Sequence, residues 1–189
     1  MSRLVILVFS TVALGFHGDA RAQWRVGASI GGFSSSTFDF EGSESKVTAF
    51  SLGGDSALVA GYEVSEAVEI GATIGFATSN LETPDDVSQT ESSNGLGVYL
   101  DYHFNPGEDT VFFAGARLGS GSSKTEVDGE TYGESDFASY GVAGGVKHFL
   151  ARNISLDVTA SYSFGTVESG DAEIDLTAMG LGFGFSARL

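Results

Sequence analysis

Every second residue from Leu96 to Phe104 is large and apolar, and the residues between them are glycine, tyrosine, aspartate and histidine. A strict period of two predicts a β-strand with one apolar face and one polar face. The pattern recurs about eight times, which predicts an all-β chain. The predicted strands cover residues 24–33, 50–62, 67–78, 95–104, 111–119, 137–146, 154–164 and 177–189.

The apolar stripes of these strands contain no Asp, Glu, Lys or Arg. A Lys or Arg facing lipid at the middle of a bilayer would cost about 2–4 kcal/mol, so the stripes fit a lipid-facing surface. Four acidic and four basic residues fall on the opposite stripes instead. Because an unpaired buried charge is strongly destabilising, we expect them to form a network of ion pairs inside a barrel. These residues are Arg25, Asp55, Glu69, Asp101, Arg117, Lys147, Asp157 and Arg188.

The connections between the predicted strands alternate between short and long. Residues 64–66, 105–109 and 151–153 form short turns, and the four remaining connections are long: residues 34–46, 80–93, 120–136 and 165–175. Short turns on one rim and long loops on the other are typical of outer-membrane barrels, in which the turns face the periplasm. The chain is therefore predicted to be an eight-stranded antiparallel up-and-down transmembrane β-barrel.

The first 22 residues have the pattern of a secretory signal peptide. A short positive start precedes the apolar run Leu4–Phe16, and Ala20-Arg21-Ala22 provides a cleavage site before Gln23. The run has 13 residues, whereas a spanning helix needs about 20. We therefore expect cleavage between Ala22 and Gln23, leaving residues 23–189 as the barrel. The chain has no cysteine, which excludes a lipid-modified cysteine and a disulfide scaffold.

Four short motifs carry a resemblance to a known family: Ala20-Arg21-Ala22 at the end of the leader, Gly61-Tyr62-Glu63-Val64, Tyr102-His103-Phe104-Asn105-Pro106, and the alternating Leu181, Phe183, Phe185, Ala187 and Leu189 at the end of the chain. The chain resembles the small eight-stranded outer-membrane barrels of Gram-negative bacteria, the outer-membrane protein A/X-like and opacity-like group. The resemblance covers residues 23–189. In that family the last strand usually ends in Phe or Trp, whereas this chain ends in Leu189.

The resemblance implies a place in the outer membrane, contact with outer-membrane lipid and lipopolysaccharide, and recognition of the last strand by the barrel-assembly machinery. We also expect a monomer. A net charge of −16 argues against nucleic acid as a partner, because phosphate binding needs basic patches.

Some barrels of this class modify lipid A, so the chain could instead be a lipid A-modifying acyl hydrolase. The related deacylases place His and Ser two residues apart, and acyl hydrolysis needs a nucleophile beside a base. Outside the leader, His103 and His148 are the candidate bases, and neither has a serine two residues away. The sequence also lacks a recognisable calcium loop or cysteine cluster. We therefore predict no catalytic residue, no cofactor and no metal-ligating motif.

The long connections carry 16 acids and only two bases, Lys46 and Lys124, so they hold −14 of the net charge of −16. These acids form either a solvated, self-repelling surface or a site where divalent cations bridge carboxylates to one another or to lipopolysaccharide. The acids are Asp39, Glu41, Glu44, Glu82, Asp85, Asp86, Glu91, Glu126, Asp128, Glu130, Glu134, Asp136, Glu168, Asp171, Glu173 and Asp175.

Eight strands leave an interior just wide enough for side chains to fill, so we expect a closed lumen. A narrow passive pore and a soluble ligand-binding barrel are two competing interpretations of the same strand pattern. Our prediction is a non-catalytic barrel that displays acidic extracellular loops, for envelope integrity or for surface interaction and adhesion.

Overall fold

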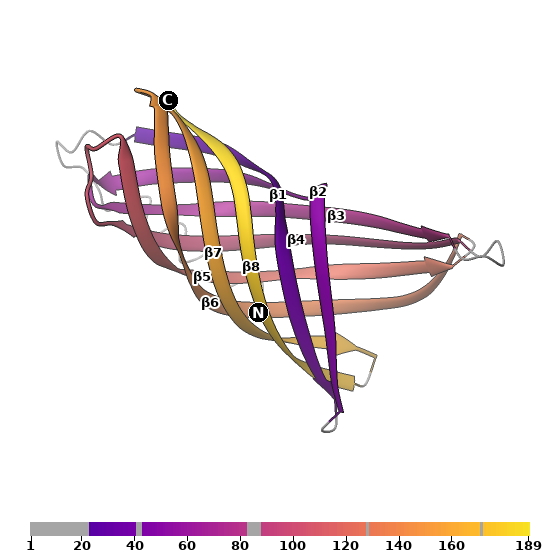
Figure 1. Ribbon diagram of the computed structural model, residues 1–189. Helices are drawn as coiled ribbons and strands as arrows, with labels where there is room; N and C mark the ends of the chain where they lie inside the picture. Colours follow the sequence, from indigo (N-terminus) through magenta and orange to yellow (C-terminus); the bar gives the residue numbers. More distant parts are fainter. Residues whose placement is uncertain (1–22, 41–42, 83–87, 128, 171) are drawn as a thin grey trace.

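The computed structural model describes residues 23–40, 43–82, 88–127, 129–170 and 172–189. Each strand pairs antiparallel with the next, and β1 pairs with β8, so the sheet closes into a barrel in sequence order (Figure 1). This confirms the predicted fold class. The strands are β1 (Gln23–Phe40), β2 (Ser43–Ser65), β3 (Val68–Glu82), β4 (Ser88–His103), β5 (Thr110–Val127), β6 (Glu130–Ala151), β7 (Ile154–Ser169) and β8 (Ala172–Arg188).

The predicted signal peptide, residues 1–22, lies outside the described residues, so its cleavage stays a prediction. Among the residues that the structure does describe, no helix is long and apolar enough to cross a membrane.

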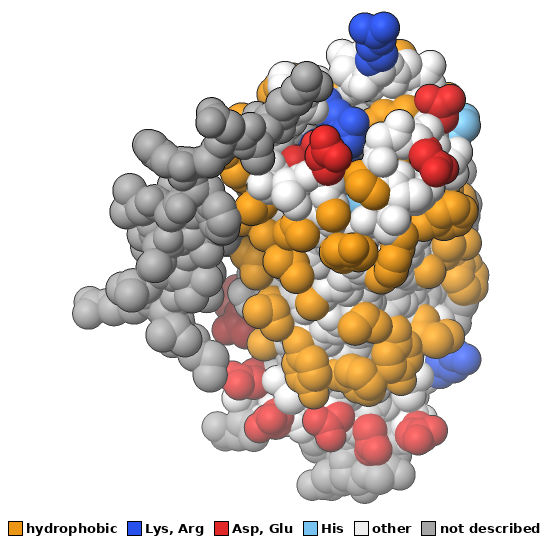
Figure 2. All heavy atoms as spheres, turned by 90° about the vertical axis from the view of Figure 1, so that its left-hand side faces the viewer, with side chains coloured by type: hydrophobic (Ala, Val, Ile, Leu, Met, Phe, Trp, Pro, Cys, Tyr) orange, Lys and Arg blue, Asp and Glu red, His pale blue; other side chains and the backbone are white. Residues whose placement is uncertain are grey.

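The two faces of the strands separate as the alternation predicts. On β4, the side chains of Leu96 and Leu100 are 64% and 51% exposed, whereas those of Tyr99 and Asp101 are 6% and 2% exposed. Figure 2 shows the resulting belt of hydrophobic side chains, with charged side chains gathered beyond it at both ends. A soluble barrel would bury its apolar stripes, so this arrangement contradicts the soluble ligand-binding barrel.

The three short connections are tight, as predicted. The strand β2 ends at Ser65 and β3 begins at Val68, while β6 ends at Ala151 and β7 begins at Ile154. In the longer turn between β4 and β5, the Asn105 side chain donates to the carbonyl oxygen of Thr110 at 2.6 Å. It also accepts from the backbone N–H of Phe112 at 2.9 Å. These turns mark the periplasmic rim.

Wherever the structure describes the predicted long loops, they are instead extensions of the strands, which corrects the sequence analysis; residues 41–42, 83–87, 128 and 171 of those loops lie outside the described residues. The strand β5 continues to Val127 and β6 begins at Glu130, so residues 120–127 and 130–136 are the two paired arms of an antiparallel hairpin and not a loop. Gly129, with φ of 82°, lies in the turn of that hairpin, where a left-handed backbone favours glycine. The polar composition suggested loops, but the alternation continues through these segments and the backbone groups satisfy one another across the strands.

The extensions differ from the belt in polarity. In the register, Phe38 of β1 lies opposite Leu176 of β8, and Val167 of β7 lies opposite Ile174 of β8. These apolar residues alternate with acidic neighbours such as Asp39 on the other face. At these positions on β1, β7 and β8, the barrel beyond the belt places carboxylates outside and apolar side chains inside, as a water-soluble sheet does.

Candidate functional site

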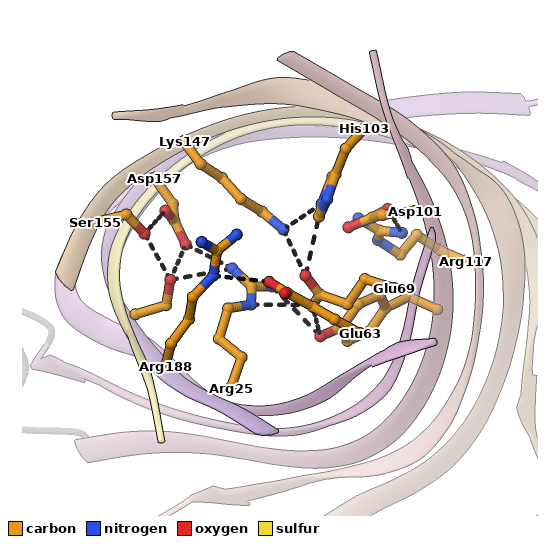
Figure 3. Close-up of polar contacts among 12 residues, drawn as sticks. Arg25, Glu63, Glu69, Asp101, His103, Arg117, Lys147, Ser155, Asp157 and Arg188 are labelled. Atoms are coloured by element: carbon orange, nitrogen blue, oxygen red, sulfur yellow. Dashed lines mark hydrogen bonds and ion pairs between the residues drawn. The ribbon is translucent and has the colours of Figure 1, made fainter. Parts of the chain in front are cut away.

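The interior of the barrel near the periplasmic rim holds one ion-paired residue from each of the eight strands. We call this set, with the polar side chains bonded to it, the lumen network. Four of the eight are carboxylates and four are cations, and Figure 3 shows their side chains pointing into the barrel. In strand order from β1 to β8, they are Arg25, Glu63, Glu69, Asp101, Arg117, Lys147, Asp157 and Arg188.

Glu69 lies at the centre of the lumen network, and its side chain is fully buried. One carboxylate oxygen accepts from the Arg25 guanidinium at 2.5 and 3.0 Å, and the other accepts from the Lys147 ammonium at 2.8 Å. The side chains of Arg25 and Lys147 are only 6% and 3% exposed. A single carboxylate therefore binds two cations from opposite parts of the barrel wall. This leaves one positive charge, which further carboxylates must balance.

Tyr99 is an uncharged hydrogen-bond partner of Glu69, because its hydroxyl donates to the Glu69 carboxylate at 2.5 Å. The ring fits because two neighbouring interior positions are glycines. A Cβ built on Gly61 would lie 2.5 Å from the Tyr99 hydroxyl, and one built on Gly71 would overlap the Tyr99 ring. Arg117 makes a cation–π contact with the same ring, because its guanidinium carbon lies 4.9 Å from the centroid of the Tyr99 ring.

Asp157 is the second carboxylate that the Arg25 guanidinium binds, at a distance of 3.1 Å. Two serines complete its hydrogen bonds: Ser155 donates to one oxygen at 2.6 Å and Ser186 donates to the other at 2.9 Å. Both serines are almost fully buried. The hydroxyls satisfy carboxylate lone pairs that the cations do not reach, as a buried charge requires.

Two further ion pairs complete the lumen network. Arg117 binds Asp101 at 2.5 Å, and Arg188 binds Glu63 at 2.8 Å. The Arg188 guanidinium also lies 4.4 Å from the centroid of the Phe149 ring. Because Glu63 and Arg188 lie close to the ends of their strands, they close the network at the periplasmic mouth.

His103, one of the two histidines considered as a base, lies inside the lumen network. Its Nε2 is 3.0 Å from the Lys147 ammonium, which makes it a hydrogen-bond acceptor, and 3.6 Å from Glu69. The second candidate, His148, lies on the outer surface with its Nδ1 2.9 Å from the Thr110 hydroxyl. Within the described ranges, no group of three or more His, Cys, Asp or Glu side chains is placed to hold a metal ion.

Seven of the eight residues expected in the lumen come together there. The eighth, Asp55, lies on β2 opposite Ala77 of β3, and its side chain is outside the described part of the chain. The structure places Glu63 as the contribution of β2. Glu63 was missed because it adjoins the predicted turn, although it shares the odd-numbered stripe with Asp55. The polar partners Tyr99, Ser155 and Ser186 were not predicted either, since neutral polar residues on an interior stripe are not distinctive.

Comparison with known proteins agrees with this architecture. Residues 3–188 match the family described as outer membrane protein beta-barrel domain. The chain belongs to this family. It is accordingly a barrel of the Gram-negative outer membrane, and it contacts outer-membrane lipid and lipopolysaccharide. No curated protein matches the chain.

Two solved barrels have the same fold at low sequence identity. Neisserial surface protein A matches with a TM-score of 0.62 and 16% identity, over 89% of this chain and 99% of that chain. The attachment invasion locus protein Ail of Yersinia pestis, solved with the heparin analogue sucrose octasulfate, matches with a TM-score of 0.56 and 13% identity. This match covers 89% of this chain and 99% of that chain.

Proposed function

We propose that this protein is a closed, non-catalytic barrel whose working surface is the acidic face of its strand extensions, and that it acts in envelope integrity or in contact between the cell and its surroundings. The observation that supports this proposal most directly is the position of the negative charge. The lumen network is balanced, with four carboxylates against four cations, so the excess charge lies elsewhere, mainly on the extensions.

The lumen network supports the non-catalytic and closed parts of the proposal. Its carboxylates are all occupied by cations or hydroxyls, and the His103 ring binds an ammonium, so these groups serve one another and not a substrate. Eight strands leave room for little besides such side chains. This argues against both the lipid A hydrolase and the passive pore.

The extensions support the surface role, because acidic residues lie directly opposite one another across neighbouring strands. Asp39 is opposite Asp175, and Asp136 is opposite Glu168. Like charges in such positions destabilise a sheet, so a role outside folding explains them better. Divalent cations are the partners we propose for these carboxylates, and the two solved barrels named for the cell surface and for attachment fit a surface role.

We also propose a monomer whose last strand is read by the barrel-assembly machinery. The alternating residues from Met179 to Leu189 supply the apolar face of that strand, and the Leu189 N–H donates to the carbonyl oxygen of Trp24 at 2.8 Å at the closing seam.

Complementation of a deletion strain tests the surface role. A variant carrying Asp39→Asn, Asp136→Asn, Glu168→Gln and Asp175→Asn should assemble normally but fail to restore the barrier to a hydrophobic dye or binding of cells to a cationic surface. The matched control neutralises Glu66, Glu108 and Asp109 on the periplasmic turns and should restore both. Full restoration of both by the first variant would overturn the proposal.

A further inference from the structure

The antiparallel ladder between β2 and β3 ends at the outer boundary of the hydrophobic belt. Its register runs from Ser65 opposite Val68 to Asp55 opposite Ala77 and, among the described residues, no further. Ala77 directly follows Phe76, which is 49% exposed on the belt. Unpaired backbone groups are not tolerated in hydrocarbon, so the ladder has to persist through the belt and can end only beyond it.

Beyond this point the two strands follow different partners. Residues 43–52 of β2 pair with β1, and residues 78–82 of β3 pair with β4. At the junction, Gly53 and Gly54 are paired with neither β1 nor β3 in the described register, and glycine weakens a strand at such a position. Figure 1 shows the outer ends of β1 and β2 diverging from those of β3 and β4. Residues 43–52 therefore form an edge strand, which we call the β2 edge.

The β2 edge is long and poorly protected. Its residues span about 33 Å, and about every second residue directs its N–H and C=O away from β1. Such a row of free backbone groups is a template for another β-strand. Natural edges are often blocked by proline or by charged side chains, especially lysine. Residues 43–52 contain no proline and a single lysine, Lys46.

The charge around the β2 edge selects the kind of strand that can approach it. The bordering segments, residues 34–54 and 78–93, contain seven acidic residues and one basic residue. Among the acids whose side chains the structure describes, Asp39, Glu44 and Glu91 are exposed. A second copy of this chain would bring the same negative charge and be repelled, whereas a strand rich in Lys and Arg would be attracted.

From the free backbone groups and the acidic surroundings, we propose that the β2 edge is a docking site for a basic, extended peptide segment of another protein, added as a further β-strand. Main-chain hydrogen bonds supply affinity in this mode of recognition, and the alternating side chains of the added strand supply specificity. The proposal rests on the surface role proposed above and gives that role a partner.

Hydrogen exchange, measured by NMR on the folded protein in detergent micelles, tests the docking site. The probe is a ten-residue peptide that alternates lysine with threonine. We expect about every second amide of the β2 edge to exchange rapidly in the free protein and to slow by about tenfold or more when the peptide binds. Residues 120–125 of β5 are the internal control, because they pair with both β4 and β6 and should be protected with or without the peptide.

Peptide affinity, measured by fluorescence anisotropy, separates strand addition from simple charge attraction. The same peptide with every backbone nitrogen methylated keeps its charges but has no N–H donors, so it should bind at least about tenfold more weakly. Glu44→Gln combined with Glu91→Gln should weaken binding of the unmodified peptide severalfold at low salt. The matched control, Glu66→Gln combined with Glu108→Gln on the periplasmic turns, should leave the affinity unchanged.

Equal affinity of the two peptides would overturn the proposal, since charge alone would then explain binding, and so would equal affinity of the two double variants. Slow exchange throughout the β2 edge in the free monomer would also overturn it. So would protection outside the β2 edge and residues 78–82, or a dimer whose formation protects the β2 edge.

The cellular test of the surface role can fail separately. Protection of the β2 edge by the peptide, together with full restoration by the neutralised variant in cells, would reject only the surface role. Loss of function in cells without protection by the peptide would reject only the docking site.

Discussion

Glu69 is the residue on which most of the lumen network converges. It accepts hydrogen bonds from Arg25, Tyr99 and Lys147, each from a different strand. Breaking a buried ion pair by removing one partner leaves an uncompensated charge, which costs more than the pair itself contributes. The stability of the periplasmic half of the barrel therefore depends on this single carboxylate more than on the surface charges.

Glu69→Gln keeps the shape of the side chain but leaves Arg25 and Lys147 without their shared carboxylate. We expect the free energy of unfolding to fall by about 3–5 kcal/mol. Urea unfolding in detergent, followed by the fluorescence of Trp24, the only tryptophan, measures it. Glu126→Gln, which removes the exposed partner of Lys124, should leave the midpoint almost unchanged. Equal effects of the two substitutions would contradict the prediction.

The glycines that face the lumen are the second residue-scale feature. Gly61→Ala places a methyl group against the Tyr99 hydroxyl and the Glu69 carboxylate, both held by hydrogen bonds, so we expect a loss of about 1–3 kcal/mol from overpacking. Gly75 is the matched control, since an added Cβ there meets nothing within 4 Å. The same urea measurement compares them. A Gly75→Ala variant as unstable as Gly61→Ala would show that backbone effects, and not contact with Tyr99, set the cost.

At the scale of the strands, the alternation of residues predicted both faces correctly because every strand repeats the same inside-outside requirement. It predicted the periplasmic ends well, since the turn residues there interrupt the pattern. The outer ends were misjudged because Ser, Thr and acidic residues were interpreted as loop composition, although Ile174 and Leu176 continue the alternation on β8. Partners within the lumen network could not be predicted, because the strand register decides which interior residues share a level.

Limited proteolysis tests the strand extensions. Lys124 lies in β5 and pairs with Ser92 and Glu134 on either side, so its backbone is held in a ladder. Trypsin should therefore leave the folded protein uncut after Lys124 and cut the urea-unfolded protein there, as judged by mass spectrometry of the fragments. Rapid cleavage after Lys124 in the folded protein would indicate the loop that the sequence analysis expected.

At the scale of the whole molecule, three zones follow one another along the barrel: the lumen network near the periplasm (Figure 3), the hydrophobic belt around the middle, and the acidic extensions outside (Figure 2). The belt fixes the protein in the membrane, and the network fills the cross-section. The fold and the location follow from the sequence pattern, whereas the function that we propose depends on the surface of the extensions.

Electrical recording in planar bilayers tests the closed lumen. Because charged side chains from all eight strands occupy the interior, we expect no stable conductance steps from the folded protein. Heat-modifiable migration on gels verifies that the sample is folded, and a sixteen-stranded porin serves as a positive control for insertion and for an aqueous channel. Reproducible steps of one size from the folded barrel would reject the closed lumen.

The one-residue-per-strand arrangement of the lumen network also constrains biogenesis. Before β8 is in place, Glu63 lacks Arg188, and Asp157 lacks Ser186. An intermediate with an open edge would leave these carboxylates without their partners beside the lipid of the membrane, which hydrates charged groups poorly. Pairing of β8 with β1 thus closes the barrel and neutralises its interior in the same step. We therefore expect assembly to be cooperative, with partly closed barrels too unstable to accumulate.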